Sequence, residues 1–222
     1  MEIFQLLLSG FASGCVYGLI ALGFVLIYKA TEAVNFAQGD MMMFGAFVTI
    51  WLTNSNYSDL PFWLSVPTMI LIMGGVGYLI ERIFLRKVIG QSQIAIAILT
   101  IALGFILRFV AGAIWGHEPH FLESPMVGKN IYFYNAVLGL AEIFVIMVTI
   151  FLTGILYLFF ARTKLGIAMV AASQNQLAAS YVGIPVNKLQ ALTWVIAGIL
   201  AGIAGMLFSA KGSVDPITGL LG

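Results

Sequence analysis

Charged side chains are scarce in this sequence. Only 10 Lys and Arg and 9 Asp and Glu occur among 222 residues, so 9% of the chain is charged while 61% is hydrophobic. An ordinary soluble domain is about one quarter charged. A water-soluble globule of this length would need far more polar surface, so the scarcity of charge predicts a polytopic membrane protein whose bulk faces lipid or other apolar helices.

Cysteine and clustered basic residues are also lacking. Cys15 is the sole cysteine, which excludes an internal disulfide and a thiolate metal site. The net charge is +1 and no basic cluster is available to neutralise phosphates, which argues against a nucleic-acid partner. Both histidines lie in 117-HEPH-120, where a polar loop is favoured over a metal site. We therefore expect this chain to bind no metal and no cofactor.

A phosphate-binding loop is missing as well. The pattern GxxxxGK[ST] does not occur, and the nearest segment, 205-GMLFSAKGS-213, lacks the glycine before its lysine and the hydroxyl residue after it. No His/Glu metal motif or Ser/His/Asp set is placed on the apolar segments. The chain is therefore not expected to be an enzyme.

Apolar runs are abundant, and about 20 such residues are needed to cross a bilayer as a helix. Six crossings are predicted, which makes the chain an all-α polytopic membrane protein. They are Leu6–Tyr28, a second that ends near Thr53, Phe62–Ile80, Ile94–Trp115, one within Phe133–Ala161, and Leu189–Ala210. No linker or low-complexity tract interrupts them, so residues 1–222 are expected to form a single transmembrane domain.

Lysine and arginine set the orientation of these helices, because cytoplasmic loops carry an excess of both. Seven cations fall in alternate loops that can share one side: Lys29, Arg82, Arg86, Lys87, Arg162, Lys164 and Lys188. The opposite side holds only Lys129 and Lys211. The bias places the seven cations in the cytoplasm and the N-terminus outside.

Glycines are regularly spaced on the first and sixth predicted helices. Gly10, Gly14 and Gly18 form a GxxxGxxxG row, and Gly198 and Gly202 form a second row. Small residues at this spacing let helix backbones approach closely in lipid. Glycine is also simply frequent in membrane helices, but the regular spacing favours packing of both rows against protein.

The segment 34-VNFAQGDMMMFG-45 places two amides and a carboxylate where the second helix begins. A helix that starts at Met41 has 13 residues before the polar loop, which is about 20 Å and too short for a core of about 30 Å. Either the helix starts near Ala33, or the chain breaks within 29–39 and re-enters. Both alternatives bury Asn35, Gln38, Gly39 and Asp40 at membrane depth.

A buried charge at this depth costs at least about 2.5 kcal/mol, so Asp40 must face a partner, a cavity or a pathway. Two roles remain open for Asn35, Gln38 and Asp40: they line a route for a small polar solute, or they only satisfy one another and cap the helix. Arg108 and Glu142 are the other charges within predicted helices. For these two we expect exposure at the interface or a pair with each other.

The segment 162–188 is predicted to lie in the cytoplasm as a short helix that ends at Gly183 and Pro185. Its alanines give a small, flat surface that suits a groove on a partner protein. An ordinary connecting loop is the alternative, and residue patterns alone favour the loop.

Three stretches carry a resemblance to a known family: 14-GCVYGLIALGFVLIYKATEAVNFAQGDMMMFGAF-47, 81-ERIFLRKVIG-90 and 166-GIAMVAASQNQLAASYVGIPVNKLQALTWVIAGILAGIAGML-207. They resemble the permease subunits of branched-chain amino acid ABC importers, and permeases for urea and short amides look alike here. The family usually has His where this chain has Gln38, and often Glu at Asp40. Family members continue into further membrane helices beyond residue 222, so we expect a chain that lacks the family's C-terminal helices.

The resemblance implies a complex in the cytoplasmic (inner) membrane of a bacterium or archaeon. Its partners would be a second permease subunit, two nucleotide-binding ATPase subunits that use the ATP, and a periplasmic or extracellular solute-binding protein. The solute would be a branched-chain amino acid or a related small polar molecule, with Asn35, Gln38, Gly39 and Asp40 on the pathway. The resemblance also implies a coupling segment that docks on an ATPase through Ala172, Ser173, Asn175, Ala178 and Gly183.

An ion-coupled secondary transporter or a channel for small polar solutes is the competing class. Such carriers often show inverted repeats and several charges within the membrane. The sequence shows no clear repeat, and only Asp40, Arg108 and Glu142 are candidate charges.

Overall fold

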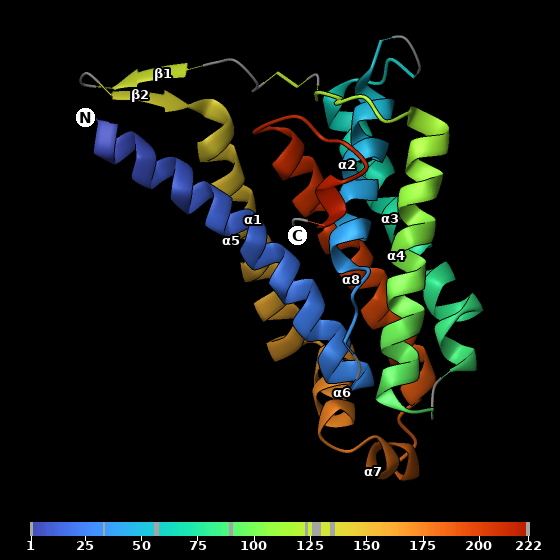
Figure 1. The fold of residues 1–222 in the computed structure, drawn as a ribbon. Coiled ribbons are helices and arrows are strands. Elements are labelled where there is room, and N and C mark those ends of the chain that lie inside the picture. The colour runs from blue at the N-terminus through green and yellow to red at the C-terminus, as the bar shows by residue number, and fades with distance from the viewer. Residues whose placement is uncertain are drawn as a thin grey trace.

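Two buried helices, α2 (Gln38–Thr53) and α8 (Val186–Ser209), form the centre of the fold (Figure 1). The computed structural model describes residues 2–32, 34–55, 58–88, 91–122, 124–125, 130–133 and 136–220. The other elements are α1 (Glu2–Thr31), α3 (Phe62–Ile83), η1 (Leu85–Lys87), α4 (Gln93–Trp115), β1 (Asn130–Phe133), β2 (Ala136–Gly139), α5 (Leu140–Arg162), α6 (Lys164–Gln174), α7 (Gln176–Tyr181) and η2 (Thr218–Leu220).

The predicted all-α polytopic class is confirmed. Within the described residues, five helices are long and apolar enough to cross a membrane, namely α1, α3, α4, α5 and α8. The remaining predicted crossing, the second along the chain, is α2, whose 16 residues span about 24 Å, less than the hydrocarbon core of about 30 Å. Fourteen of its residues are buried, so this short helix is surrounded by protein rather than by lipid.

Glycines bring α8 into close contact with α2 and α3. A β-carbon on Gly198 would lie 2.5 Å from the carbonyl oxygen of Met73, and one on Gly202 would lie 2.7 Å from the sulfur of Met69. On α2, Gly45 faces the backbone of Gly202 so closely that no side chain fits between them. The structure thus places the predicted Gly198 and Gly202 row where three backbones approach one another.

The glycine row on α1 has a different environment. Helix α1 packs against α8 and pairs with α5 at one side of the molecule (Figure 1). Gly10, Gly14 and Gly18 are exposed, and a β-carbon at any of them would meet nothing within 4 Å in the described part of the chain. None of the described residues packs on this row, so its predicted packing against protein stays a prediction and would involve another protein chain.

The cationic loops gather at one end of the molecule, the end that holds α6 and α7 (Figure 1). Lys29, Arg82 and Arg162 lie in the last turns of α1, α3 and α5, and η1 carries two further cations. The N-terminus lies at the opposite end (Figure 1). This arrangement agrees with the predicted orientation, and we refer to the cationic end as the cytoplasmic end.

The outer end contains a small β-hairpin that the sequence did not predict. β1 and β2 pair antiparallel, with Asn130 opposite Gly139, between the long outer loop and α5. The tail after α8 starts at this end, where His120 and Val214 exchange backbone hydrogen bonds of 2.9 Å.

Lys211 ties the tail to α1. Its ammonium donates to the Ser9 carbonyl at 2.9 Å and to the Ser13 hydroxyl. Burial lowers the pKa of Lys211, and the negative charge of Glu142 opposes that shift. The contact is one reason why the end of α8 and the outer half of α1 stay together.

Candidate functional site

A non-helical segment, residues 34–37, joins α1 to α2 inside the protein. Helix α1 ends at Thr31 and α2 begins at Gln38, so the structure shows the second predicted alternative, a break within 29–39. Asn35 is 1% exposed and Ala37 is fully buried. Irregular backbone at membrane depth persists only where protein or water satisfies its polar groups. Figure 1 shows the chain rising from the cytoplasmic end before α2 starts.

Thr100 on α4 provides one of the hydrogen bonds to the backbone of this segment. Its hydroxyl accepts a hydrogen bond from the backbone N–H of Phe36 at 3.2 Å and donates to the carbonyl of Ala97 at 2.9 Å. The side chain of Asn35 accepts from the N–H of Ala37 at 3.1 Å. Two side chains, one local and one from a distant helix, therefore fix this segment.

Replacing Thr100 with Val should destabilise the protein, because it keeps the volume but leaves the Phe36 N–H of this non-helical segment without its acceptor. The expected loss is about 1–3 kcal/mol, measured as a lower thermal unfolding temperature of the purified full-length protein. Thr68→Val is the matched control, since the Thr68 hydroxyl bonds only within its own helix. Equal unfolding temperatures for the two variants would contradict this role for Thr100.

The two predicted amides contact each other. The Asn35 amide donates to the Gln38 side-chain oxygen at 3.1 Å and lies 3.9 Å from the sulfur of Met41. Gln38 packs beside Gly23 on α1, where any side chain would collide with its amide nitrogen. That nitrogen is buried and has no hydrogen-bond partner among the described residues. The two amides thus make most of their hydrogen bonds within this segment, but the Gln38 nitrogen makes none.

Asp40 pairs with Arg108, which gives Asp40 one of its expected environments, a partner, and corrects the expectation for Arg108. Arg108 donates to both carboxylate oxygens of Asp40, with the terminal guanidinium nitrogen 3.0 Å from Oδ2. Asp40 is 1% exposed, so its charge is removed from lipid. A bidentate pair of this kind compensates a carboxylate that would otherwise be costly to bury. The predicted alternatives for Arg108, exposure or a pair with Glu142, are wrong.

Two glycines shape the site around Asp40. A β-carbon on Gly104 of α4 or on Gly219 of η2 would collide with one of its carboxylate oxygens. Gly39, the remaining residue of the predicted site, is buried in the first turn of α2. The returning tail and α4 thus enclose the carboxylate from two sides.

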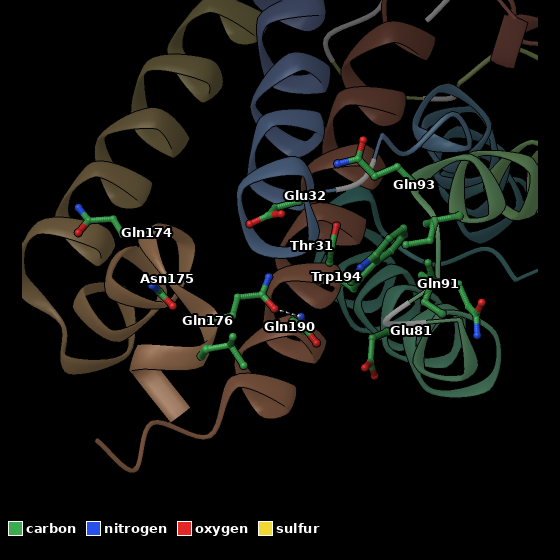
Figure 2. A pocket seen from close by; sticks show the side chains of 13 residues that line it. Thr31, Glu32, Glu81, Gln91, Gln93, Gln174, Asn175, Gln176, Gln190 and Trp194 are labelled. Carbon is green, nitrogen blue, oxygen red and sulfur yellow. Dashed lines mark hydrogen bonds between the residues drawn. The ribbon is translucent and has the colours of Figure 1, made fainter. Parts of the chain in front are cut away.

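A cavity of about 460 Å³ lies at the cytoplasmic end, between the membrane helices and the segment of α6 and α7 (Figure 2). Its lining is Thr31, Glu32, Glu81, Leu85, Gln91, Gln93, Ile96, Gln174, Asn175, Gln176, Leu177, Gln190 and Trp194. Six of these carry amides and two carry carboxylates, whereas Asn35, Gln38 and Asp40 are not among them. The cavity is therefore distinct from the buried polar cluster.

The predicted cytoplasmic segment forms two helices rather than one. Asn175 separates α6 from α7 and caps α7 by accepting from the N–H of Ala178 at 2.9 Å. Gly183 follows α7 with a φ of 85°, a backbone conformation that favours glycine. Both Asn175 and Ala178 are exposed, and Ser173 is partly exposed.

Ala172 does not belong to the outer surface of this segment. It is 7% exposed and packs with Met169, Ala179 and Leu189 against α8. Its prediction as a docking residue is wrong, because the inner side of α6 needs a small side chain to lie against the bundle. The exposed side presents larger apolar groups instead, with Tyr181 87% and Val182 77% exposed.

Several residues of the site were missed from the sequence. Thr100, Gly104 and Gly219 act through contacts between segments far apart in the chain, and no local pattern marks them. Glu81 and Gln190 had a usable signal, since each is a polar residue within an apolar helix. Among the described residues, no group of three or more His, Cys, Asp and Glu side chains could hold a metal ion.

Comparison with known proteins gives the chain its family. The sequence profile described as "Branched-chain amino acid transport system / permease component" matches residues 6–221. The permease protein BraD of a high-affinity branched-chain amino acid transport system in Pseudomonas aeruginosa is 28% identical, over 98% of this chain and 74% of the relative. No solved structure gives a significant match.

Two further relatives carry similar names. A probable branched-chain amino acid transport permease, LivH of Methanocaldococcus jannaschii, is 32% identical over 90% of this chain, which spans 64% of that relative. LivH of Salmonella typhimurium is 26% identical over 98% of this chain and 74% of the relative. With five helices in its described part that are long and apolar enough to cross a membrane, the chain is a multi-pass protein of the inner membrane. It belongs to the family of permease components of branched-chain amino acid transport systems.

Proposed function

We propose that this chain is a permease subunit of an ATP-driven importer that moves branched-chain amino acids, or a related small polar solute, into the cytoplasm. The observation that carries the proposal is the family profile, which matches almost the whole chain. The buried polar residues of α2 support it, because a transport route needs polar groups at membrane depth that lipid does not reach. The chain itself is a transport subunit rather than an enzyme.

The pathway proposed from the sequence includes Asn35, Gln38, Gly39 and Asp40. In the state described here these residues are buried and mostly paired with protein groups. An alternating-access cycle requires that a second state expose them to the solute. A ligand or a nucleotide shifts such an equilibrium only through different affinities for the two states.

The partners follow from the same proposal. Two ATPase subunits would bind the cytoplasmic end and supply the ATP hydrolysis, so this chain would bind no cofactor. A second permease subunit would complete the pathway, and the open glycine row of α1 is a surface for it. The outer loops 54–61 and 116–132 would receive a solute-binding protein; parts of both loops lie outside the described residues.

Replacing Tyr181 and Val182 with Ser should weaken binding of the ATPase. Both side chains are highly exposed at the end of α7, and exposed apolar groups of this kind mark contact surfaces. We expect at least a tenfold loss of association in a pull-down from solubilised membranes. Phe121→Ser is the control, since Phe121 is 68% exposed at the other end of the molecule. Unchanged association of the double variant would exclude docking at this surface.

The whole proposal is tested by uptake into proteoliposomes that contain the full-length permease, its partner subunits and the solute-binding protein. Labelled leucine should accumulate inside only when ATP is present on the ATPase side. Urea and short amides, tested in the same vesicles, decide the solute class. Leucine uptake that persists without ATP but follows an ion gradient would favour the alternative, an ion-coupled carrier.

A further inference from the structure

The cytoplasmic cavity joins the membrane helices to the segment that we propose to dock on the ATPase. Glu81 reaches it from α3, Gln190 and Trp194 reach it from α8, and Gln176 reaches it from α7 (Figure 2). At about 460 Å³ it is large enough for a small organic solute. A ligand there would contact both moving parts of the proposed transport cycle.

The cavity holds buried acceptors that protein groups do not satisfy. Glu81 is 1% exposed, and neither of its carboxylate oxygens has a hydrogen-bond partner in the described part of the chain. Glu81 does form an ion pair with Arg86, whose Nε lies 3.5 Å from Oε1, and Oε2 takes no part in that contact. Gln190 is 3% exposed, and its side-chain oxygen is also without a partner there. Buried acceptors are normally paired, so Glu81 Oε2 and the Gln190 oxygen, which have neither a hydrogen bond nor an ion pair among the described residues, point to a ligand with several donors.

One residue of the lining also carries a buried donor. Trp194 is 1% exposed, and its indole N–H has no acceptor among the residues that the structure describes. The amides nearby are partly engaged, because Gln176 donates to the carbonyl of Ala30 at 3.0 Å and Gln190 approaches Gln176 at 3.5 Å. Leu85, Ile96 and Leu177 add apolar side chains to the lining.

We propose that this cavity binds a free amino acid with an apolar side chain from the cytoplasmic side. A primary ammonium carries three N–H donors, which matches the unmet oxygens of Glu81 and Gln190. The ligand's carboxylate accepts from the indole N–H of Trp194, and its side chain lies against the apolar part of the lining. The inference deepens the proposed function, because it takes the imported solute as the ligand of a second, cytoplasmic site.

Three probes separate the two ends of the ligand. Leucine carries both groups, 3-methylbutylamine carries only the ammonium, and 4-methylpentanoate carries only the carboxylate. Binding of each is measured by calorimetry on the solubilised complex of full-length permease and ATPase, without nucleotide and without the solute-binding protein. We expect leucine and the amine to bind and the acid to bind at least tenfold more weakly, because the acid cannot satisfy the Glu81 carboxylate.

Variants assign the contacts. Glu81→Gln should weaken leucine and the amine at least tenfold, whereas Trp194→Phe should weaken leucine but leave the amine unchanged. Glu118→Gln, an exposed carboxylate of the outer loop, is the control and should change neither. If the Glu81→Gln variant fails to assemble, Trp194→Phe still tests the proposal, because this substitution removes only the indole N–H.

Several results would overturn the proposal. Equal binding of leucine and 4-methylpentanoate would remove the role of the ammonium, and full binding by Glu81→Gln would remove that of the carboxylate. Leucine binding by the free permease that disappears in the complex would show that an ATPase side chain fills the cavity. Failure here leaves ATP-dependent leucine uptake intact, whereas failure of the proposed function abolishes that uptake and leaves the amine binding measurable.

Discussion

Replacing Asp40 with Ala is expected to cost about 3–5 kcal/mol of stability, because it leaves the Arg108 guanidinium without its counter-ion. The lower end of that range applies, since the Arg108 side chain is 22% exposed and can turn toward water or headgroups. Uptake should fall together with the thermal unfolding temperature. This differs from the expectation for a carboxylate that only lines a pathway, whose removal would lower uptake and leave the fold intact.

The double variant Asp40→Asn with Arg108→Gln separates the two roles. It keeps the shape of the Asp40 side chain, replaces the Arg108 guanidinium with a shorter neutral amide and removes both charges, so its unfolding temperature should lie well above that of Asp40→Ala. Uptake that returns together with stability would make the pair structural, whereas uptake that stays low in a stable protein would assign Asp40 to the pathway. Stability losses that simply add in the double variant would contradict the pairing itself. Glu118→Ala, exposed in the outer loop, is the control.

Replacing Gly77 with Ala is expected to have the second large effect. A β-carbon at Gly77 would collide with the backbone of Trp194 on α8, and backbone atoms cannot move aside as a side chain can. The two helices must separate, which costs about 1–3 kcal/mol. The change should lower the unfolding temperature and, because Trp194 also lines the cytoplasmic cavity, alter ligand binding there.

Gly75 provides the matched control on the same helix. A β-carbon there meets nothing within 4 Å, so Gly75→Ala should be neutral or stabilising, as expected for alanine in place of glycine within a helix. If both variants unfold at the same temperature, the close approach of α3 and α8 does not limit stability. If both are destabilised, the effect comes from helix α3 itself rather than from its contact with α8.

The sequence was sufficient for the parts of the fold that depend on local composition. Long apolar runs predicted five of the helices within a few residues, and the cations of alternate loops gave their orientation. The break before α2 was one of two alternatives, because a helix start at residue 33 and a re-entry bury the same side chains. The choice depends on Thr100, which reaches the segment from a helix more than sixty residues away.

The candidate site was only partly predictable for the same reason. Burial of Asn35, Gln38 and Asp40 followed from the cost of polar groups in lipid, and the structure agrees with it. The partner of Asp40 could not be predicted, since the position of a carboxylate in the sequence does not indicate which distant cation it will meet in the fold. Likewise, the cytoplasmic cavity collects polar side chains from six helices, and each of them alone resembles an ordinary interfacial residue.

The shortness of α2 has a consequence for biogenesis. A translocon selects nascent segments by their length and hydrophobicity, and 16 residues that begin with Gln-Gly-Asp form a weak signal. The helix that covers most of α2 is α8, which is synthesised more than a hundred residues later. Until then the growing chain must hold α2 at the translocon or against α3 and α4, so completion of α8 is the event that commits this polypeptide to its final topology.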